Sequence, residues 1–224
     1  MALVGGADAR CHDGVTSGDR TTGIDLYWIP LGAGGSGFVR FNGRVYEAIT
    51  ARRRGGRRAH LLHTALRVHV PEGSFVVETV WPSPDRRTQE RGVAREGPVA
   101  HPTLACSRVF RYEVRRWRDG SLPDEDQAIG GPRRVSDDPA QAHRLLDAVP
   151  SMPVLTWGRD EAGAGEMWNS NSVISWLLFE SGVSLDRCIA PPGCRAPGWD
   201  AGVLVARGSR PLDAHGTGAS SGGR

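Results

Sequence analysis

The chain contains no lysine: it has 224 residues, and all 28 of its basic side chains are arginine. It also has only four cysteines, and none of them lies in a Cys-x-x-Cys pair. This spacing argues against a zinc site or a disulfide framework, and no cofactor is expected. The absence of lysine accompanies an abundance of alanine, glycine and proline, which indicates GC-rich coding and carries no functional information.

Long apolar runs are missing as well. No stretch approaches the roughly 20 apolar residues that span a bilayer, and residues 1–22 lack the basic and apolar regions of a secretion signal. We therefore expect no membrane span and a cytoplasmic protein. The net charge of +3 is small for this length and argues against a dedicated nucleic-acid binder.

The two ends of the sequence differ from its middle. Residues 1–22 show no apolar period, and residues 208–224 are rich in glycine and serine. We expect both segments to be disordered tails. Residues 23–207 are then a single domain with enough apolar content for a core.

The first third of the chain predicts strands. Residues 24–31 form a first strand, and Asn42-Gly43 predicts a hairpin between residues 38–41 and 44–49. The glycine-rich loop at 32–37 lacks the Lys-Ser/Thr of a phosphate-binding loop, and a strand follows it where a dinucleotide site needs a helix. The arginine run at 52–58 has no aromatic residues for base stacking, so a solvated loop is favoured over a phosphate site.

A second hairpin follows. Residues 63–70 alternate, with Thr64, Leu66, Val68 and Val70 on one face and His63, Ala65, Arg67 and His69 on the other. Residues 75–81 return after a turn near Glu72-Gly73, which places Arg67 opposite Val77 or Glu78.

The rest of the chain alternates between loops and helices. Residues 82–104 predict a loop and residues 109–117 a strand. The Ser-Asp-Asp-Pro segment at 136–139 starts a helix that ends near Val149 and buries Ala142, Leu145, Leu146 and Val149. A second helix runs from about Ser170 to Ser181-Gly182, and residues 202–206 predict a final strand. The fold class is therefore α+β, with a mostly antiparallel sheet packed on helices.

The start of the second helix is the best candidate site. Small polar residues at 169–172 give way at once to the apolar residues 173–179. A helix N-terminus offers free N–H groups and a positive partial charge, so backbone amides of Ser170 and Asn171 could stabilise an oxyanion. A serine nucleophile needs a general base, and His63 at the start of a strand is the best candidate.

The order of these residues resembles the circularly permuted papain-like proteins, which include the PPPDE-type peptidases and the lecithin–retinol acyltransferase group. His63, opening its strand, is similar to the family's catalytic base. Asn169-Ser170-Asn171 is similar to the family's Asn-Cys-Asn, with serine in place of the nucleophilic cysteine. The resemblance implies a papain-like fold, in which an antiparallel sheet packs on a buried central helix.

Two functions follow from this pattern. The first is a hydrolase or acyltransferase in which Ser170 attacks an amide, ester or thioester of a peptide or small acyl substrate, with His63 as base. The second is a catalytically inactive papain-like domain that binds a peptide or other ligand, because Ser170 and Asn169 are also ordinary helix caps. Glu78 is a candidate acid to orient His63, although it could instead pair with Arg67. A weaker third hypothesis is an arginine-rich module that binds nucleic acid or anionic surfaces through residues 52–58.

Overall fold

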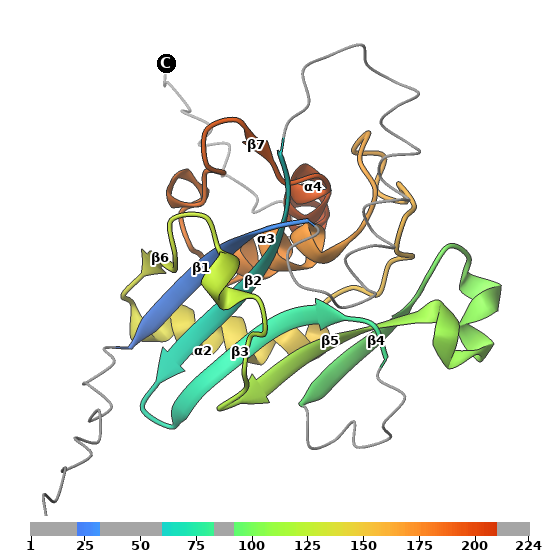
Figure 1. The fold of residues 1–224 in the computed structure, drawn as a ribbon. Coiled ribbons are helices and arrows are strands. Elements are labelled where there is room, and N and C mark those ends of the chain that lie inside the picture. Colours follow the sequence, from blue (N-terminus) through green and yellow to red (C-terminus); the bar gives the residue numbers. More distant parts are fainter. Residues whose placement is uncertain (1–21, 32–59, 83–91, 210–224) are drawn as a thin grey trace, which may run out of the picture.

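The central sheet is antiparallel except for one short strand. The computed structural model describes residues 22–31, 60–82 and 92–209. Its strands are β1 (Gly23–Pro30), β2 (His60–Val70), β3 (Gly73–Val80), β4 (Val93–Pro98), β5 (Arg111–Arg118), β6 (Arg133–Ser136) and β7 (Cys194–Arg195). Their spatial order is β4-β5-β3-β2-β1-β6, and β7 pairs in parallel with the start of β2 (Figure 1).

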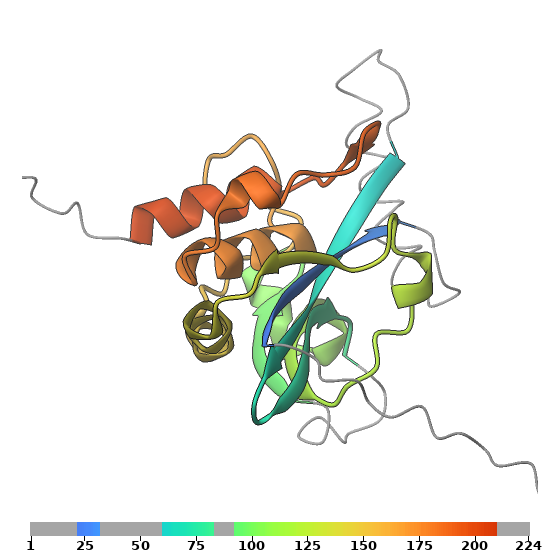
Figure 2. The ribbon, with the colours of Figure 1, turned by 90° about the vertical axis from the view of Figure 1, so that its left-hand side faces the viewer.

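The helices cover one face of this sheet. Figure 2 shows the three α-helices together on one side, and the 3-10 helix Glu125–Gln127 on the other. The α-helices are α2 (Pro139–Ala148), α3 (Ser170–Glu180) and α4 (Trp199–Ser209). The 3-10 helices are η1 (Pro102–Cys106), η2 (Arg108–Phe110), η3 (Glu125–Gln127), η4 (Val149–Ser151) and η5 (Leu185–Arg187). The predicted α+β class and the mostly antiparallel sheet are therefore confirmed.

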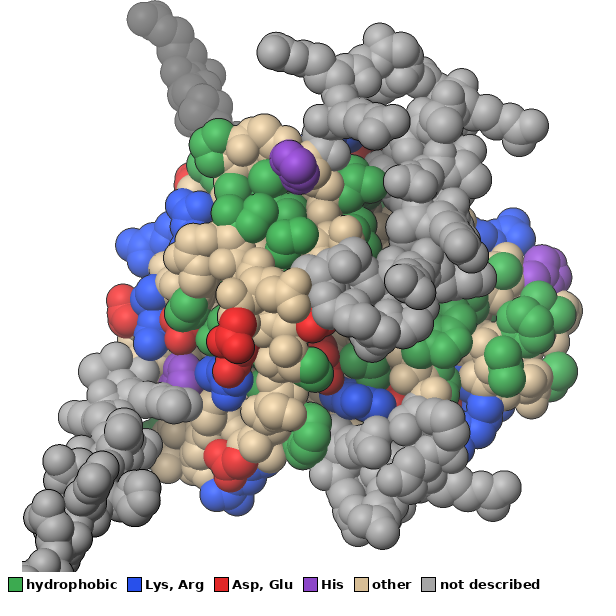
Figure 3. Space-filling model, in the orientation of Figure 1, with side chains coloured by type: hydrophobic (Ala, Val, Ile, Leu, Met, Phe, Trp, Pro, Cys, Tyr) green, Lys and Arg blue, Asp and Glu red, His purple; other side chains and the backbone are tan. Residues whose placement is uncertain are grey.

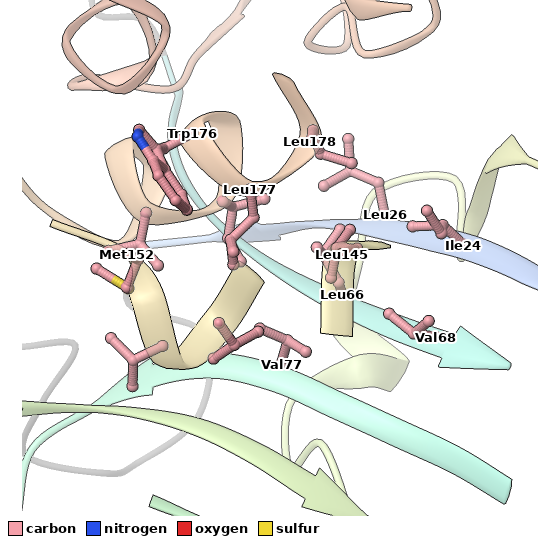
Figure 4. Close-up of a cluster of buried hydrophobic side chains, with 14 of the residues drawn as sticks. Ile24, Leu26, Leu66, Val68, Val77, Leu145, Met152, Trp176, Leu177 and Leu178 are labelled. Carbon is pink, nitrogen blue, oxygen red and sulfur yellow. The ribbon is translucent and has the colours of Figure 1, made fainter. Parts of the chain in front are cut away.

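The face of the sheet that meets the helices is apolar. Leu66 and Val68 of β2 lie in one buried cluster with Leu145 of α2 and Leu177 of α3 (Figure 4). This is the face predicted from the alternation of β2. The helix from Pro139 also follows the prediction, because Asp138 caps it and the four apolar residues expected to be buried are buried.

The opposite face of the sheet carries ion pairs. Asp25 of β1 contacts His69 of β2 and Arg134 of β6, with distances of 3.2 Å and 2.8 Å. On β5, Glu113 is fully buried and accepts a hydrogen bond from Arg115 at 3.0 Å. The same face also holds a second, smaller apolar cluster, formed by Tyr27, Ile29, Ala65, Val76 and Leu122, so ion pairs and apolar contacts share it.

Helices α3 and α4 approach each other at a glycine. A Cβ atom on Gly202 would lie 2.0 Å from the backbone oxygen of Ser172 and 2.2 Å from Ser175 Oγ, so no larger residue fits without a shift. Residues 202–206 were predicted as a strand, and this prediction is wrong because they belong to α4. A short apolar run does not distinguish a strand from a buried helix.

Other boundaries also differ from the sequence predictions. Residues 82–104 contain β4 and η1, so they are not a continuous loop, and β6 was not predicted. The turn lies at Pro71 and Glu72, which places Arg67 opposite Val76, one residue from the expected register. Residues 208–209, predicted to begin a tail, continue α4.

Several predictions lie outside the described residues. They are the N-terminal tail at 1–21, the glycine loop and hairpin at 32–49, the arginine run at 52–58 and the tail from 210 onward. Within the described parts of the chain, no helix is long and apolar enough to cross a membrane. An apolar lobe is formed by η1 and η2, where Leu104, Val109 and Phe110 are exposed (Figure 3).

Candidate functional site

Asn169 caps α3 through a reciprocal pair of hydrogen bonds. Its Oδ1 accepts from the backbone N–H groups of Asn171 at 2.8 Å and Ser172 at 3.4 Å. In return, Ser172 Oγ accepts from the backbone N–H of Asn169 at 3.1 Å. This is a capping box, which satisfies N–H groups that a helix start leaves free. The backbone N–H of Asn171, expected to help stabilise an oxyanion, is therefore already bonded.

The side chain of Asn171 ties α3 to the sheet. Its Oδ1 accepts from Thr64 Oγ1 at 3.0 Å, and its Nδ2 donates to the backbone oxygens of Leu62 at 3.0 Å and Pro197 at 2.8 Å. Only 2% of Asn171 is exposed. The residue therefore acts as a buried clamp that joins β2, α3 and the segment before α4, a role that sequence reasoning missed.

Serine side chains on α3 extend this clamp toward α4. Ser172 Oγ donates to the backbone oxygen of Gly198 at 2.7 Å, and Ser175 Oγ donates to that of Trp199 at 2.7 Å. A Cβ atom on Gly198 would lie 2.6 Å from Asn169 Nδ2, so glycine permits this approach. The polar residues at the start of α3 are thus mostly engaged in holding the chain together.

Ser170 occupies the first turn of α3, as predicted. It is 4% exposed, and its hydroxyl makes no hydrogen bond to a described residue. Its neighbours on both sides are bonded structurally, but Ser170 itself is not. The Ser170 hydroxyl therefore contributes no hydrogen bond to the described part of the fold.

His63 lies on β2 between the two residues that contact Asn171. Successive side chains of a strand point to opposite faces, so His63 points away from the face of Thr64. Its Nε2 is buried without a hydrogen-bond partner, and burial lowers the pKa of His63 to about 4. The imidazole is consequently neutral at physiological pH, and no hydrogen bond joins it to Ser170.

Glu78 does not orient His63. Its carboxylate lies 3.8 Å from Arg115 Nη1, and Arg67 pairs instead with Glu125. Burial raises the pKa of Glu78 to about 7; Arg115 opposes this shift and Asp124 adds to it. The acid thus belongs to the charged face of the sheet, with no bond to the proposed base.

That charged face was not recognised from the sequence as a unit. Glu113 links Arg108 at 3.3 Å and Arg115 at 3.0 Å. The signal was present, because residues 111, 113, 115 and 117 alternate onto one face of a predicted strand. The sequence analysis predicted this strand but did not pair its arginines with acids.

A groove along β4 was also missed. It is a shallow, largely open groove with a volume of about 330 Å³, and it is lined by Val93, Ala94, Arg95, Glu96 and Val154. The sequence predicted a loop over residues 82–104, so it did not indicate the strand edge that β4 forms. Among the described residues, no group of three His, Cys, Asp or Glu side chains could hold a metal ion.

Comparisons with known proteins identified no relative of this chain. No family model matches the chain, and no curated protein or solved structure shows significant similarity to it.

Proposed function

We propose that this chain is a catalytically inactive papain-like domain that serves as a peptide-binding module. The observation that carries the proposal is the use of Asn171, whose side chain and backbone N–H are all bonded within the fold. The arrangement of a buried helix that begins Asn169-Ser170-Asn171 and packs on an antiparallel sheet supports the papain-like part of the proposal.

The absence of a base at Ser170 supports inactivity. A serine hydroxyl needs a base within roughly 2.6–3.2 Å in order to lose its proton as it attacks. His63 makes no such contact, and its side chain leaves β2 on the face opposite to Thr64. A change of side-chain rotamer does not move a residue to the other face of a strand, so the two groups need a backbone rearrangement to meet.

Two other parts of the predicted hydrolase site are engaged elsewhere. An oxyanion hole requires backbone N–H groups aimed at the reacting oxygen, but of the two groups expected here, on Ser170 and Asn171, that of Asn171 is held by Asn169 Oδ1. The candidate orienting acid, Glu78, is beside Arg115. Catalysis through Ser170 and His63 is the competing function, and a covalent labelling experiment distinguishes it from the proposal.

A serine-reactive fluorophosphonate separates the two functions. We expect no labelling of the native protein beyond that of the matched variants Ser170→Ala and His63→Ala. Circular dichroism should confirm that each variant is folded. Labelling at Ser170 that disappears in His63→Ala, located by peptide mass spectrometry, would overturn the proposal and establish the hydrolase.

The variant Ser170→Cys provides a positive control for access. A thiol at a helix N-terminus is more readily ionised than a hydroxyl, so it tests whether the position can be reached at all. Because Cys106 is exposed and Cys188 is buried, the alkylated residue must be assigned by mass spectrometry. Alkylation of Ser170→Cys without fluorophosphonate labelling of the native protein is the expected combination.

A further inference from the structure

The outer edge of β4 presents backbone groups that the sheet does not use. β4 is the last strand in the sheet order (Figure 1). In an antiparallel pair, residues alternate between those whose N–H and C=O groups point toward the partner and those whose groups point away. Val99 N–H donates to the backbone oxygen of Phe110 at 2.8 Å, so the backbone groups of Val99 point toward the chain that leads into β5. Because this direction alternates from residue to residue, the backbone groups of Pro98 and Glu96 point away from β5.

A neighbouring segment begins to pair with this edge and then stops. Trp157 N–H donates to the backbone oxygen of Pro98 at 2.9 Å, and Ala100 N–H donates to that of Trp157 at 3.0 Å. Proline has no N–H, so the ladder cannot continue past it in the same direction. The backbone oxygen of Leu155 instead accepts from the Tyr112 hydroxyl at 2.9 Å. Among the described residues no further backbone hydrogen bond joins this segment to β4, and Val154 lines the groove together with Glu96.

The groove contains an arginine without an anionic partner. Arg95 Nε is buried and has no hydrogen-bond partner, and no ion pair connects its guanidinium to the described residues. Arg111, nearby on β5, differs because it pairs with Glu96 at 2.9 Å. A half-buried guanidinium favours a carboxylate, with which it can form charge-assisted hydrogen bonds. Val154, which is 38% exposed, adds an apolar contact on the other wall.

We propose that this groove binds a short extended peptide that carries an acidic side chain. The peptide backbone continues the ladder that Trp157 begins, using the outward N–H and C=O of Glu96, and its glutamate or aspartate pairs with Arg95. This is strand addition to a sheet edge. The irregularity between Val93 and Arg95 limits the regular edge to a few residues. The inference rests on the proposed peptide-binding function and assigns its site and its ligand chemistry.

Peptide pools with one fixed residue test the assignment. The probes are fluorescein-labelled pentapeptides blocked at the C-terminus as amides, with random flanking positions and a central Glu, Gln or Lys. We expect the Glu pool to bind and to shift the amide resonances of Glu96 and Gly97 in the ¹⁵N-labelled protein. The Arg95→Gln variant should weaken binding of the Glu pool by about tenfold. Equal binding of the Glu and Gln pools, or no binding of any pool, would overturn the inference.

Three controls make the outcome specific. Arg118→Gln, on an exposed arginine of β5, should leave binding unchanged. Glu96→Pro, which removes the outward N–H, should abolish it; because this change can disturb β4, Arg95→Gln remains the deciding variant, and thermal unfolding checks both. The third control is a matched set of the same pools with a free C-terminal carboxylate. Binding by this set alone would overturn the assignment of the acidic side chain to Arg95.

The same spectra distinguish this inference from the proposed function. Peptide-induced shifts around Ser170, with none on β4, would preserve a peptide-binding module and overturn the site proposed here. His63-dependent fluorophosphonate labelling would refute catalytic inactivity, while shifts on β4 would still establish the groove as a binding site.

Discussion

The start of α3 and the outer edge of β4 use their polar groups in opposite ways. At α3, Asn171 forms hydrogen bonds with groups on β2 and before α4, and almost every polar neighbour is bonded. At β4, Arg95 Nε has no partner and the outward groups of Glu96 face a groove. The stretch that resembles a catalytic motif is therefore a structural joint. The stretch without a recognisable motif leaves Arg95 Nε unbonded, and this is where we propose that a ligand binds.

Replacing Asn171 is the strongest test of the structural side of this comparison. Asn171→Leu removes three buried hydrogen bonds and leaves the Thr64 hydroxyl and the Leu62 carbonyl without these partners, while the Pro197 carbonyl keeps its bond from Asn169 Nδ2. We expect the free energy of unfolding to fall by about 4 kcal/mol, measured by urea denaturation. Thr64→Val removes one of the three bonds and should cost about 1 kcal/mol. A loss below 1 kcal/mol for Asn171→Leu would contradict the role of a clamp.

His63 Nε2 is buried without a hydrogen-bond partner in a region that is otherwise mostly bonded. The pH dependence of the free energy of unfolding measures the cost of this burial. Its pKa falls from 6.5 in the unfolded chain to about 4 in the fold because of burial. The unfolded state binds the proton more readily between these values, so stability is full above pH 6.5 and falls as the pH drops toward 4. The loss should reach up to about 3 kcal/mol. His63→Leu should remove it; an unchanged pH profile in that variant would show that His63 is solvated.

Glu78 should give the opposite slope in the same experiment. Burial raises its pKa from 4.5 to about 7, so the unfolded chain releases the proton more readily between these values. Its contribution to stability is therefore present below pH 4.5 and is lost as the pH rises through 7. At pH 8, Glu78→Gln should stabilise the fold by about 3 kcal/mol, because the raised pKa already includes the opposing attraction of Arg115. Because Glu72, His143 and Glu161 also have shifted pKa values, the slope of Glu78 is taken as the difference between His63→Leu and the double variant His63→Leu/Glu78→Gln. Identical profiles for these two variants would contradict the shift.

The smallest effect is expected at Ser170. Its hydroxyl makes no hydrogen bond to a described residue, so Ser170→Ala should change the free energy of unfolding by less than about 0.5 kcal/mol. The same urea titration that detects Asn171→Leu provides the measurement. A cost above 1 kcal/mol would place Ser170 among the structural residues and weaken the contrast with its neighbours.

The sequence anticipated the elements whose patterns are local. The alternation of β2, the cap and buried face of α2, and the bounds of α3 all depend on nearby residues. β4 was missed because its irregular register between Val93 and Arg95 breaks the period of two. α4 was mistaken for a strand because its approach to α3 through Gly202 is not visible in a short apolar run.

For the candidate site, the sequence located Ser170 and its cap but not the partners of Asn171. The carbonyl of Leu62 is 109 residues away and belongs to the backbone, so no residue type marks it. The side of β2 that His63 occupies was accessible in principle, because the strand's more apolar face contains Leu66 and Val68 and excludes His63. That pattern already pointed the histidine away from the helices.

The clamp at Asn171 also has a consequence for the order of events during synthesis. Thr64 and Asn171 are 107 residues apart, so the hydroxyl that is buried in the finished fold has to wait for its acceptor. At a translation rate of roughly 5–20 residues per second, that wait is on the order of 5–20 s. During this time the Leu62 carbonyl and the Thr64 hydroxyl lack the partner that they have in the finished fold, and both gain it when one asparagine emerges.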